Sequence, residues 1–147
     1  MYDVLYYKSY FDTMIMNERE KDSIVRYWIE TAKRDNETLI TLFESGRYPE
    51  SLFFGHIVIE KMIKGLIVKN TASLPPFTHD LIHLADLAHL LLSKVETNFL
   101  SLLNRFNIRA RYPEYKLSLY KKCNKKFTEA NLKNFKQLYK KLCQKLN

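Results

Sequence analysis

The sequence predicts an all-α protein, an antiparallel bundle of four to five helices. Only three glycines and four prolines interrupt its 147 residues, and 46% of the residues are hydrophobic. This composition suits a compact helical domain and leaves few turn residues for an all-β sandwich. Apolar residues recur at helical spacing along most of the chain, and no stretch alternates as a strand does. The length fits one domain with one core.

The first predicted helix covers residues 21–45. Its apolar positions recur at intervals of three, four and seven between Ile24 and Leu42, which describes one face of an amphipathic helix that ends at Gly46. Asp35 lies on the same face, where a carboxylate costs free energy unless a donor binds it. We therefore expect either a bound partner for Asp35 or a carboxylate that reaches water at the edge of that face.

The second predicted helix runs from Arg47 to Asn70. Pro49 lies in its first turn, where the missing N–H does no harm. The helix is apolar almost all round, so we expect it at the centre, covered by neighbouring helices or by a second subunit. Glu60 and Lys64 are the polar exceptions, spaced i,i+4 with the acid first, which is the better order for an ion pair.

Three histidines lie in or near the third predicted helix. Thr78 is a good N-cap, so this helix is expected to begin near His79. His79, His83 and His89 do not share a face with metal-ligand spacing, and no carboxylate–histidine motif accompanies them. The sequence therefore predicts neither a metal site nor a cofactor.

The last two predicted helices are separated by a linker. The fourth covers about residues 93–111 and ends because Pro113 pushes Tyr112 out of the helical region. Thr128 is the expected N-cap of a fifth, lysine-rich helix over about residues 128–147.

The remaining features predict a cytoplasmic protein. Cys123 and Cys143 lie in no disulfide or metal motif, so we expect reduced thiols. No stretch is apolar enough to cross a membrane, and charged residues interrupt the N-terminus where a signal peptide is apolar. Residues 1–20 form an N-terminal extension of undecided structure, and residues 21–147 form a single helical domain.

The net charge of +8 belongs to the C-terminal part of the chain. Residues 116–147 hold ten lysines and one acid, whereas residues 1–115 hold 14 basic and 15 acidic groups. A lysine-rich segment binds nucleic acid or acidic partners through counterion release. Most such segments are solvated helix faces, so the charge alone does not identify a binding site.

The strongest candidate binding residues lie in the stretch NRFNIRARYPEY, at the end of the fourth helix. Arg105, Arg109 and Tyr112 are spaced i, i+4 and i+7 and share one line on a helix, with Asn107 and Arg111 beside it. Two guanidinium groups above a phenol can hold a phosphate or a carboxylate, or can pair with acids of neighbouring helices. No nucleophile–base pair accompanies them, so no catalytic residue is assigned.

The order of these pieces resembles the HEPN (higher eukaryotes and prokaryotes nucleotide-binding) family. The matching pieces are YWIETAKRDNETLITLFESGRYPESLFFGHIVIEKMIKGLI, PPFTHDLIHL and RARYPEY. The resemblance covers roughly residues 22–146 and implies an antiparallel helical bundle, usually a homodimer with a polar site near the dimer groove. Many family members are metal-independent ribonucleases with an Arg-x(4–6)-His motif. Read as Arg-x4-His-x-Tyr, this sequence has Arg105 and Tyr112, but Ala110 replaces the histidine.

The resemblance and this departure together predict a HEPN protein without ribonuclease activity, because alanine cannot transfer the protons that RNA cleavage requires. We expect a homodimer that binds a nucleotide or phosphate and is the partner of a nucleotidyltransferase-type protein, as in a toxin–antitoxin pair. The expected binding residues are Arg105, Asn107, Arg109, Arg111 and Tyr112, supported by Asp35, Glu60, Lys64 and His79. One alternative is a divergent ribonuclease toxin that uses His79 or His83. The other is an interaction module whose lysine-rich last helix binds RNA or an acidic protein.

Overall fold

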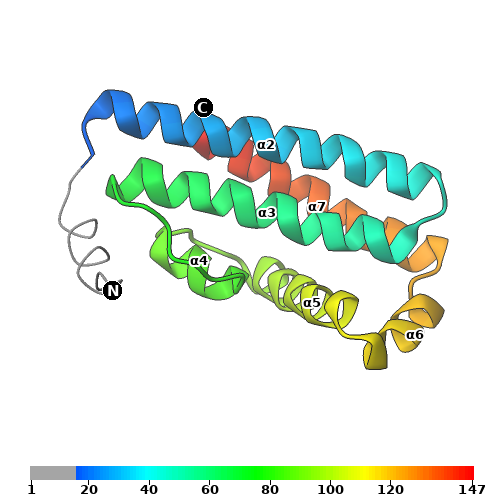
Figure 1. The fold of residues 1–147 in the computed structure, drawn as a ribbon. Helices are drawn as coiled ribbons and strands as arrows, with labels where there is room; N and C mark the ends of the chain where they lie inside the picture. Colours follow the sequence, from blue (N-terminus) through cyan, green and yellow to red (C-terminus); the bar gives the residue numbers. More distant parts are fainter. Residues whose placement is uncertain (1–15) are drawn as a thin grey trace, which may run out of the picture.

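The chain folds into a bundle of α-helices (Figure 1). The computed structural model describes residues 16–147, except for the side chains of residues 109–111, 113, 115 and 116. The helices are α2 (Glu18–Glu44), α3 (Tyr48–Thr71), α4 (Leu81–Leu87), α5 (Lys94–Arg111), α6 (Pro113–Lys122) and α7 (Lys125–Leu146). The described residues contain no strand. The predicted all-α antiparallel bundle is confirmed.

Helix α3 lies at the centre of the bundle. It contacts all five other helices, and 15 of its 24 residues are buried. Figure 1 shows α2 and α7 running along one side of α3, while α4 and α5 follow each other along the other side. The sequence predicted this central place from the nearly all-round apolar surface of α3. The short α6 lies at one end, beside the end of α5.

The ends of the long helices follow local sequence signals. The Asn17 side chain accepts a hydrogen bond from the backbone of Glu20, and the Glu20 side chain accepts one from the backbone of Asn17, which forms a capping box for α2. Ser93 and Glu96 form the same motif at α5. Tyr112 has extended backbone angles (φ −108°, ψ 121°), as expected for a residue before proline.

Three predicted helix starts are wrong, and the first is that of α2, which begins at Glu18, three residues before the predicted residue 21. Helix α4 begins two residues later than expected, because the Asp80 side chain, not that of Thr78, accepts the hydrogen bonds of its first turn. The Thr78 hydroxyl instead accepts from the backbone N–H of Asp80 at 3.2 Å. At α7 the N-cap is Asn124, and Thr128 is buried inside the helix. The lysine-rich helix α7 therefore begins at Lys125, three residues before the predicted start at residue 128.

The predicted linker before α7 contains a helix that the sequence analysis missed. Pro113 ends α5 but also occupies the first turn of α6, a position that proline favours. Helix α6 is short, and its apolar residues do not form a single strong face. Leu119 is its buried anchor, at 2% exposure.

Gly65 permits the close packing of α3 against α2. A Cβ atom at Gly65 would lie 3.2 Å from Cβ of Trp28, closer than most real contacts, whereas a Cβ at Gly55 would meet only ordinary contacts of 3.6 Å. We expect Gly65→Val to lower the free energy of unfolding by about 1–3 kcal/mol through overpacking. The matched control Gly55→Ala should be neutral or stabilising, because alanine favours the helix by up to about 1 kcal/mol. Urea unfolding measures both, and equal effects of the two substitutions would contradict this account.

Candidate functional site

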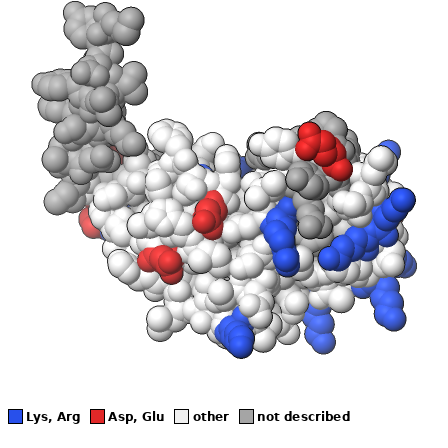
Figure 2. Space-filling view, turned by 90° about the horizontal axis from the view of Figure 1, so that it is seen from below, with Lys and Arg blue, Asp and Glu red and all other residues white. Residues whose placement is uncertain are grey.

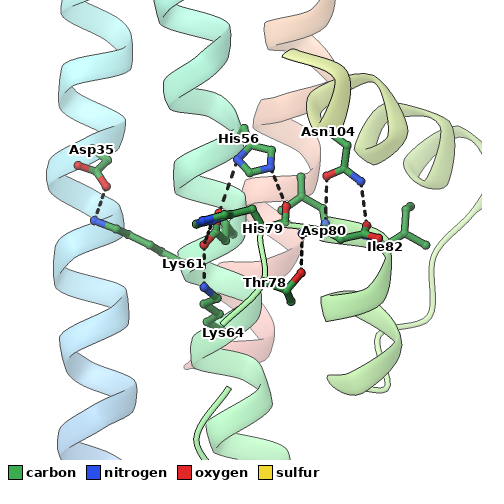
Figure 3. Close-up of polar contacts among 11 residues, drawn as sticks. Asp35, His56, Lys61, Lys64, Thr78, His79, Asp80, Ile82 and Asn104 are labelled. Carbon is green, nitrogen blue, oxygen red and sulfur yellow. Dashed lines mark hydrogen bonds and ion pairs between the residues drawn. The ribbon is translucent and has the colours of Figure 1, made fainter. Parts of the chain in front are cut away.

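His56, Lys64 and His79 lie close together in a cluster of polar side chains (Figure 3), and all three contact Glu60 of α3. The Glu60 carboxylate accepts a hydrogen bond from Lys64 Nζ at 2.7 Å and lies 3.0 and 3.1 Å from Nδ1 of His79. Glu60 and Lys64 are both buried. Burial on its own raises the pKa of Glu60, but the hydrogen bonds from Lys64 and His79 outweigh it and hold that pKa below its usual 4.5. The predicted i,i+4 ion pair is confirmed, and His79 joins it.

His56, one turn before Glu60 on α3, belongs to the same cluster. Its Nε2 donates to the backbone carbonyl of His79 at 3.0 Å, which leaves Nδ1 facing a Glu60 oxygen at 3.7 Å. The side chain is 0% exposed, and Nδ1 has no hydrogen-bond partner. Burial lowers the pKa of His56 from 6.5, because the charged form is poorly solvated there, and the charge of Glu60 opposes this only in part.

His56 was not among the site residues predicted from the sequence. Its spacing of four residues from Glu60 on the central helix was the available signal. The backbone carbonyl that it binds comes from the loop before α4, and nothing local in the sequence places that loop against α3.

The turn that carries His79 is also attached to α5. The Asn104 side chain donates to Asp80 Oδ1 at 2.9 Å and accepts from the backbone N–H of Leu81 at 3.0 Å. Asp80 at the same time caps α4. These bonds join the start of α4 to α5 at the residue before Arg105, so the polar cluster connects α3, α4 and α5.

Asp35 has a partner on α3, which confirms the first of the two alternatives predicted for its carboxylate, a bound partner rather than contact with water. Its carboxylate pairs with Lys61 Nζ at 2.5 Å, and both side chains are largely buried. Lys61 follows Glu60 directly in the sequence. The four predicted supporting residues therefore gather around one stretch of α3. The bonds to Asn104 of α5 are made by the two residues that follow His79, Asp80 and Leu81.

The predicted binding residues are divided between two sides of α5. Arg105 is exposed, and Tyr112 is 54% exposed. Asn107 is buried, with 7% exposure, so it faces the protein interior rather than the side of Arg105. The side chains of Arg109 and Arg111 lie outside the described residues.

Arg105 lines a small hollow between α5 and α6. Its volume is about 30 Å³, and Lys122, at the end of α6, is the second charged residue of the lining. The remaining lining residues are apolar: Leu102, Phe106 and Leu119. Figure 2 shows the face on which α4, α5 and α6 lie, with lysine and arginine side chains gathered toward the α5–α6 end and most acidic side chains toward the other end.

Two further observations concern metal ions and membranes. Among the residues that the structure describes, no three His, Cys, Asp or Glu side chains are grouped so as to hold a metal ion. None of the described helices combines the length and apolar character that a bilayer span needs.

The comparisons with known proteins identify a family. No curated protein and no solved structure gave a significant match. The family model of the HEPN domain matches residues 25–146, which include all of α3 to α7 and most of α2. This match covers most of the chain and agrees with the all-helical fold. The chain therefore belongs to the HEPN domain family.

Proposed function

We propose that this protein binds the phosphate groups of a nucleotide or RNA at the α5–α6 end and does not cleave RNA. The observation that carries the proposal is the hollow in which Arg105 and Lys122 are the charged lining residues among those whose side chains the structure describes. Membership of the HEPN family, which suggests nucleotide-binding or ribonuclease-like functions, supports the same class of ligand.

The charge around the hollow favours an anion. Residues 104–126 contain eight basic residues and a single acid, Glu114. A guanidinium group binds two phosphate oxygens at once, and an ammonium group adds a point charge. Because both side chains are exposed to solvent, the affinity should fall as the salt concentration rises.

The absence of cleavage is proposed from the sequence of α5. Ala110 stands where the ribonucleases of the family have the motif's histidine. Arg105 and Lys122 are cationic side chains suited to binding phosphate, not the imidazole or carboxylate bases that usually move a proton in such a reaction. The α5–α6 end therefore has groups that attract phosphate but no imidazole of its own to move a proton.

The proposal includes a homodimer that covers the outer side of α5. Ile108 and Tyr112 are both more than half exposed, and they lie three and seven residues beyond Arg105, on the same side of the helix. A second copy packed there would cover these apolar groups and bring two Arg105 side chains toward one groove. Light scattering tests the dimer directly, and a strict monomer would contradict it.

The proposal also includes a partner protein and a cytoplasmic location. A nucleotidyltransferase-type partner in a toxin–antitoxin pair is supported by the family resemblance alone. Cys123 and Cys143 are present as thiols, which supports the proposed cytoplasmic location.

Substitution of the hollow tests the proposed phosphate site. We expect Arg105→Ala and Lys122→Ala each to weaken binding of a labelled short RNA or nucleotide about tenfold, since hydrogen bonds to charged groups contribute about 1.5–3 kcal/mol. The matched control is Lys133→Ala, which removes an exposed lysine of α7. Fluorescence anisotropy at two salt concentrations measures the affinity.

The same experiments distinguish the proposed site from the two alternatives, an interaction module on α7 and a divergent ribonuclease. If Lys133→Ala weakens binding more than Arg105→Ala, the α7 interaction module is favoured and the proposed site is wrong. The same RNA, analysed on a denaturing gel, reports cleavage. Cleavage that disappears in His79→Ala would establish the divergent ribonuclease instead.

A further inference from the structure

The strongest unassigned chemical feature is the imidazole of His79. The chain has four histidines: His56 is buried, and His79, His83 and His89 are exposed. Among the three exposed rings, His79 alone has a carboxylate partner in the part of the chain that the structure describes. This difference within one molecule indicates that the reactivity of His79 should differ from that of the other two.

The contact with Glu60 fixes which nitrogen of His79 is available. Glu60 is ionised near neutral pH, because its pKa lies below 4.5, so it can only accept hydrogen bonds. Nδ1 of His79, 3.0 Å from the nearer oxygen, must therefore carry the proton. In the neutral ring the lone pair is then on Nε2, and the side chain is 59% exposed.

The ring is exposed but held in place. The His79 carbonyl accepts a hydrogen bond from the buried His56, and the next residue, Asp80, is bound by Asn104 of α5 (Figure 3). The carbonyl of His79 is thus bound to α3, and the two residues that follow it are bound to α5. A fixed ring loses less conformational freedom when its Nε2 reacts or binds than a mobile surface side chain does.

The surrounding charges favour a reaction at Nε2. A carboxylate on Nδ1 holds the ring in one tautomer and orientation, and it stabilises the positive charge that forms on the ring when Nε2 makes a new bond. Lys64 Nζ lies 2.7 Å from the same carboxylate and provides positive charge near the ring. An oriented imidazole near an ammonium group is suited to attack an electrophile that carries negative oxygens, and a phosphoryl group is of that kind.

We propose that Nε2 of His79 is a phosphoryl-acceptor site, held by Glu60 and supplied by a nucleoside triphosphate bound to a separate transferase. In this step the Nε2 lone pair forms a bond to the γ-phosphorus as the bond from phosphorus to the bridging oxygen breaks. The leaving nucleoside diphosphate keeps that electron pair. The ring becomes an imidazolium whose Nδ1 proton stays against Glu60 until solvent removes it. This site is separate from the α5–α6 hollow, so it does not depend on the phosphate binding proposed there.

A small phosphoryl donor tests the acceptor without knowledge of the transferase. The intact protein is incubated with potassium phosphoramidate, and the phosphorylated histidines are located by mass spectrometry after digestion at alkaline pH. We expect His79 to be modified about tenfold faster than His83 or His89, a ratio in the range that carboxylate partners of histidine confer on ligand binding and activity. Equal rates at the three exposed rings, or faster labelling of His83 or His89, would overturn the proposal.

A second variant tests the role of Glu60. Glu60→Gln keeps an oxygen that can accept from Nδ1 but removes the charge, so labelling of His79 should fall about tenfold while His83 is unaffected. If the labelling rate of His79 is unchanged in a folded Glu60→Gln protein, Glu60 has only a structural role and the proposal is wrong. The comparison of the three rings in the unaltered protein remains decisive even if this variant does not fold.

Discussion

Replacement of Glu60 by leucine is expected to lower the free energy of unfolding by about 3 kcal/mol. The carboxylate accepts from Lys64 and His79 in a buried place, with only 12% of its side chain exposed. Without it, the Lys64 ammonium keeps its desolvation cost and loses its nearest counter-charge. Among the described residues, Lys64 then keeps a weaker contact, with Nζ 5.8 Å from the centre of the Trp28 ring. Urea unfolding at neutral pH measures the loss.

The double variant Glu60→Leu with Lys64→Met is the matched control. Leucine and methionine approximate the volumes of the replaced side chains and leave no charge behind, so most of the lost stability should return. The difference between the single and double variants isolates the cost of the unpaired charge. If the double variant is less stable than Glu60→Leu, the unpaired charge of Lys64 is not what destabilises the single variant, and our account of the cost is wrong.

The fold was predicted where local pattern and tertiary packing agree. The all-round apolar surface of α3 can be buried only at the centre of a bundle, and the structure places it there. The i,i+4 spacing of Glu60 and Lys64 likewise requires only a helix to bring the two side chains together. For Asp35 the sequence indicated the need for a partner but could not identify Lys61, because periodicity does not reveal how α2 and α3 are aligned.

The start of α4 and the presence of α6 were predicted wrongly, because a distant residue determines the first and the second depends on a proline that fits two interpretations. Thr78 and Asp80 are both good N-caps, and the choice of Asp80 is stabilised by Asn104, 24 residues later in the chain. Pro113 was interpreted only as the end of α5, although proline is equally suited to the first turn of α6.

In the candidate site, too, local sequence predicts some features, while others depend on residues far apart in the chain. Arg105 could be proposed as a binding residue from its spacing along α5, and that assignment stays a prediction. The contact between Glu60 and His79, by contrast, depends on the path of the loop between α3 and α4. Local sequence carries no information about that path. The sequence therefore did not distinguish His56, which donates to the His79 carbonyl of that loop, from the other buried residues of α3.

Acidification from pH 7 to pH 4 is expected to destabilise the protein in two steps. The first step comes from His56, whose folded pKa is below 6.5 because its buried ring resists protonation. As the pH falls below 6.5, the unfolded chain binds the proton first, so stability decreases until the folded pKa is passed. Each pKa unit of lowering corresponds to about 1.4 kcal/mol.

The second step comes from Glu60, whose folded pKa is below 4.5. Its contacts with Lys64 and His79 stabilise the fold while it is ionised, and this stabilisation is lost as the pH falls through the folded pKa. Both steps therefore have the same sign, and the protein should be most resistant to urea near neutral pH.

The variant His56→Gln separates the two steps. Glutamine retains an N–H that can donate to the His79 carbonyl but does not titrate, so the decrease between pH 7 and pH 5 should become flatter while the decrease below pH 4.5 persists. His83→Gln is the control, because this exposed ring makes no ion pair among the described residues and its replacement should leave both steps in place. Urea unfolding at closely spaced pH values gives the slopes. An unchanged slope above pH 5 in His56→Gln would show that another group takes up the proton, and the assignment of the first step to the buried imidazole would then be wrong.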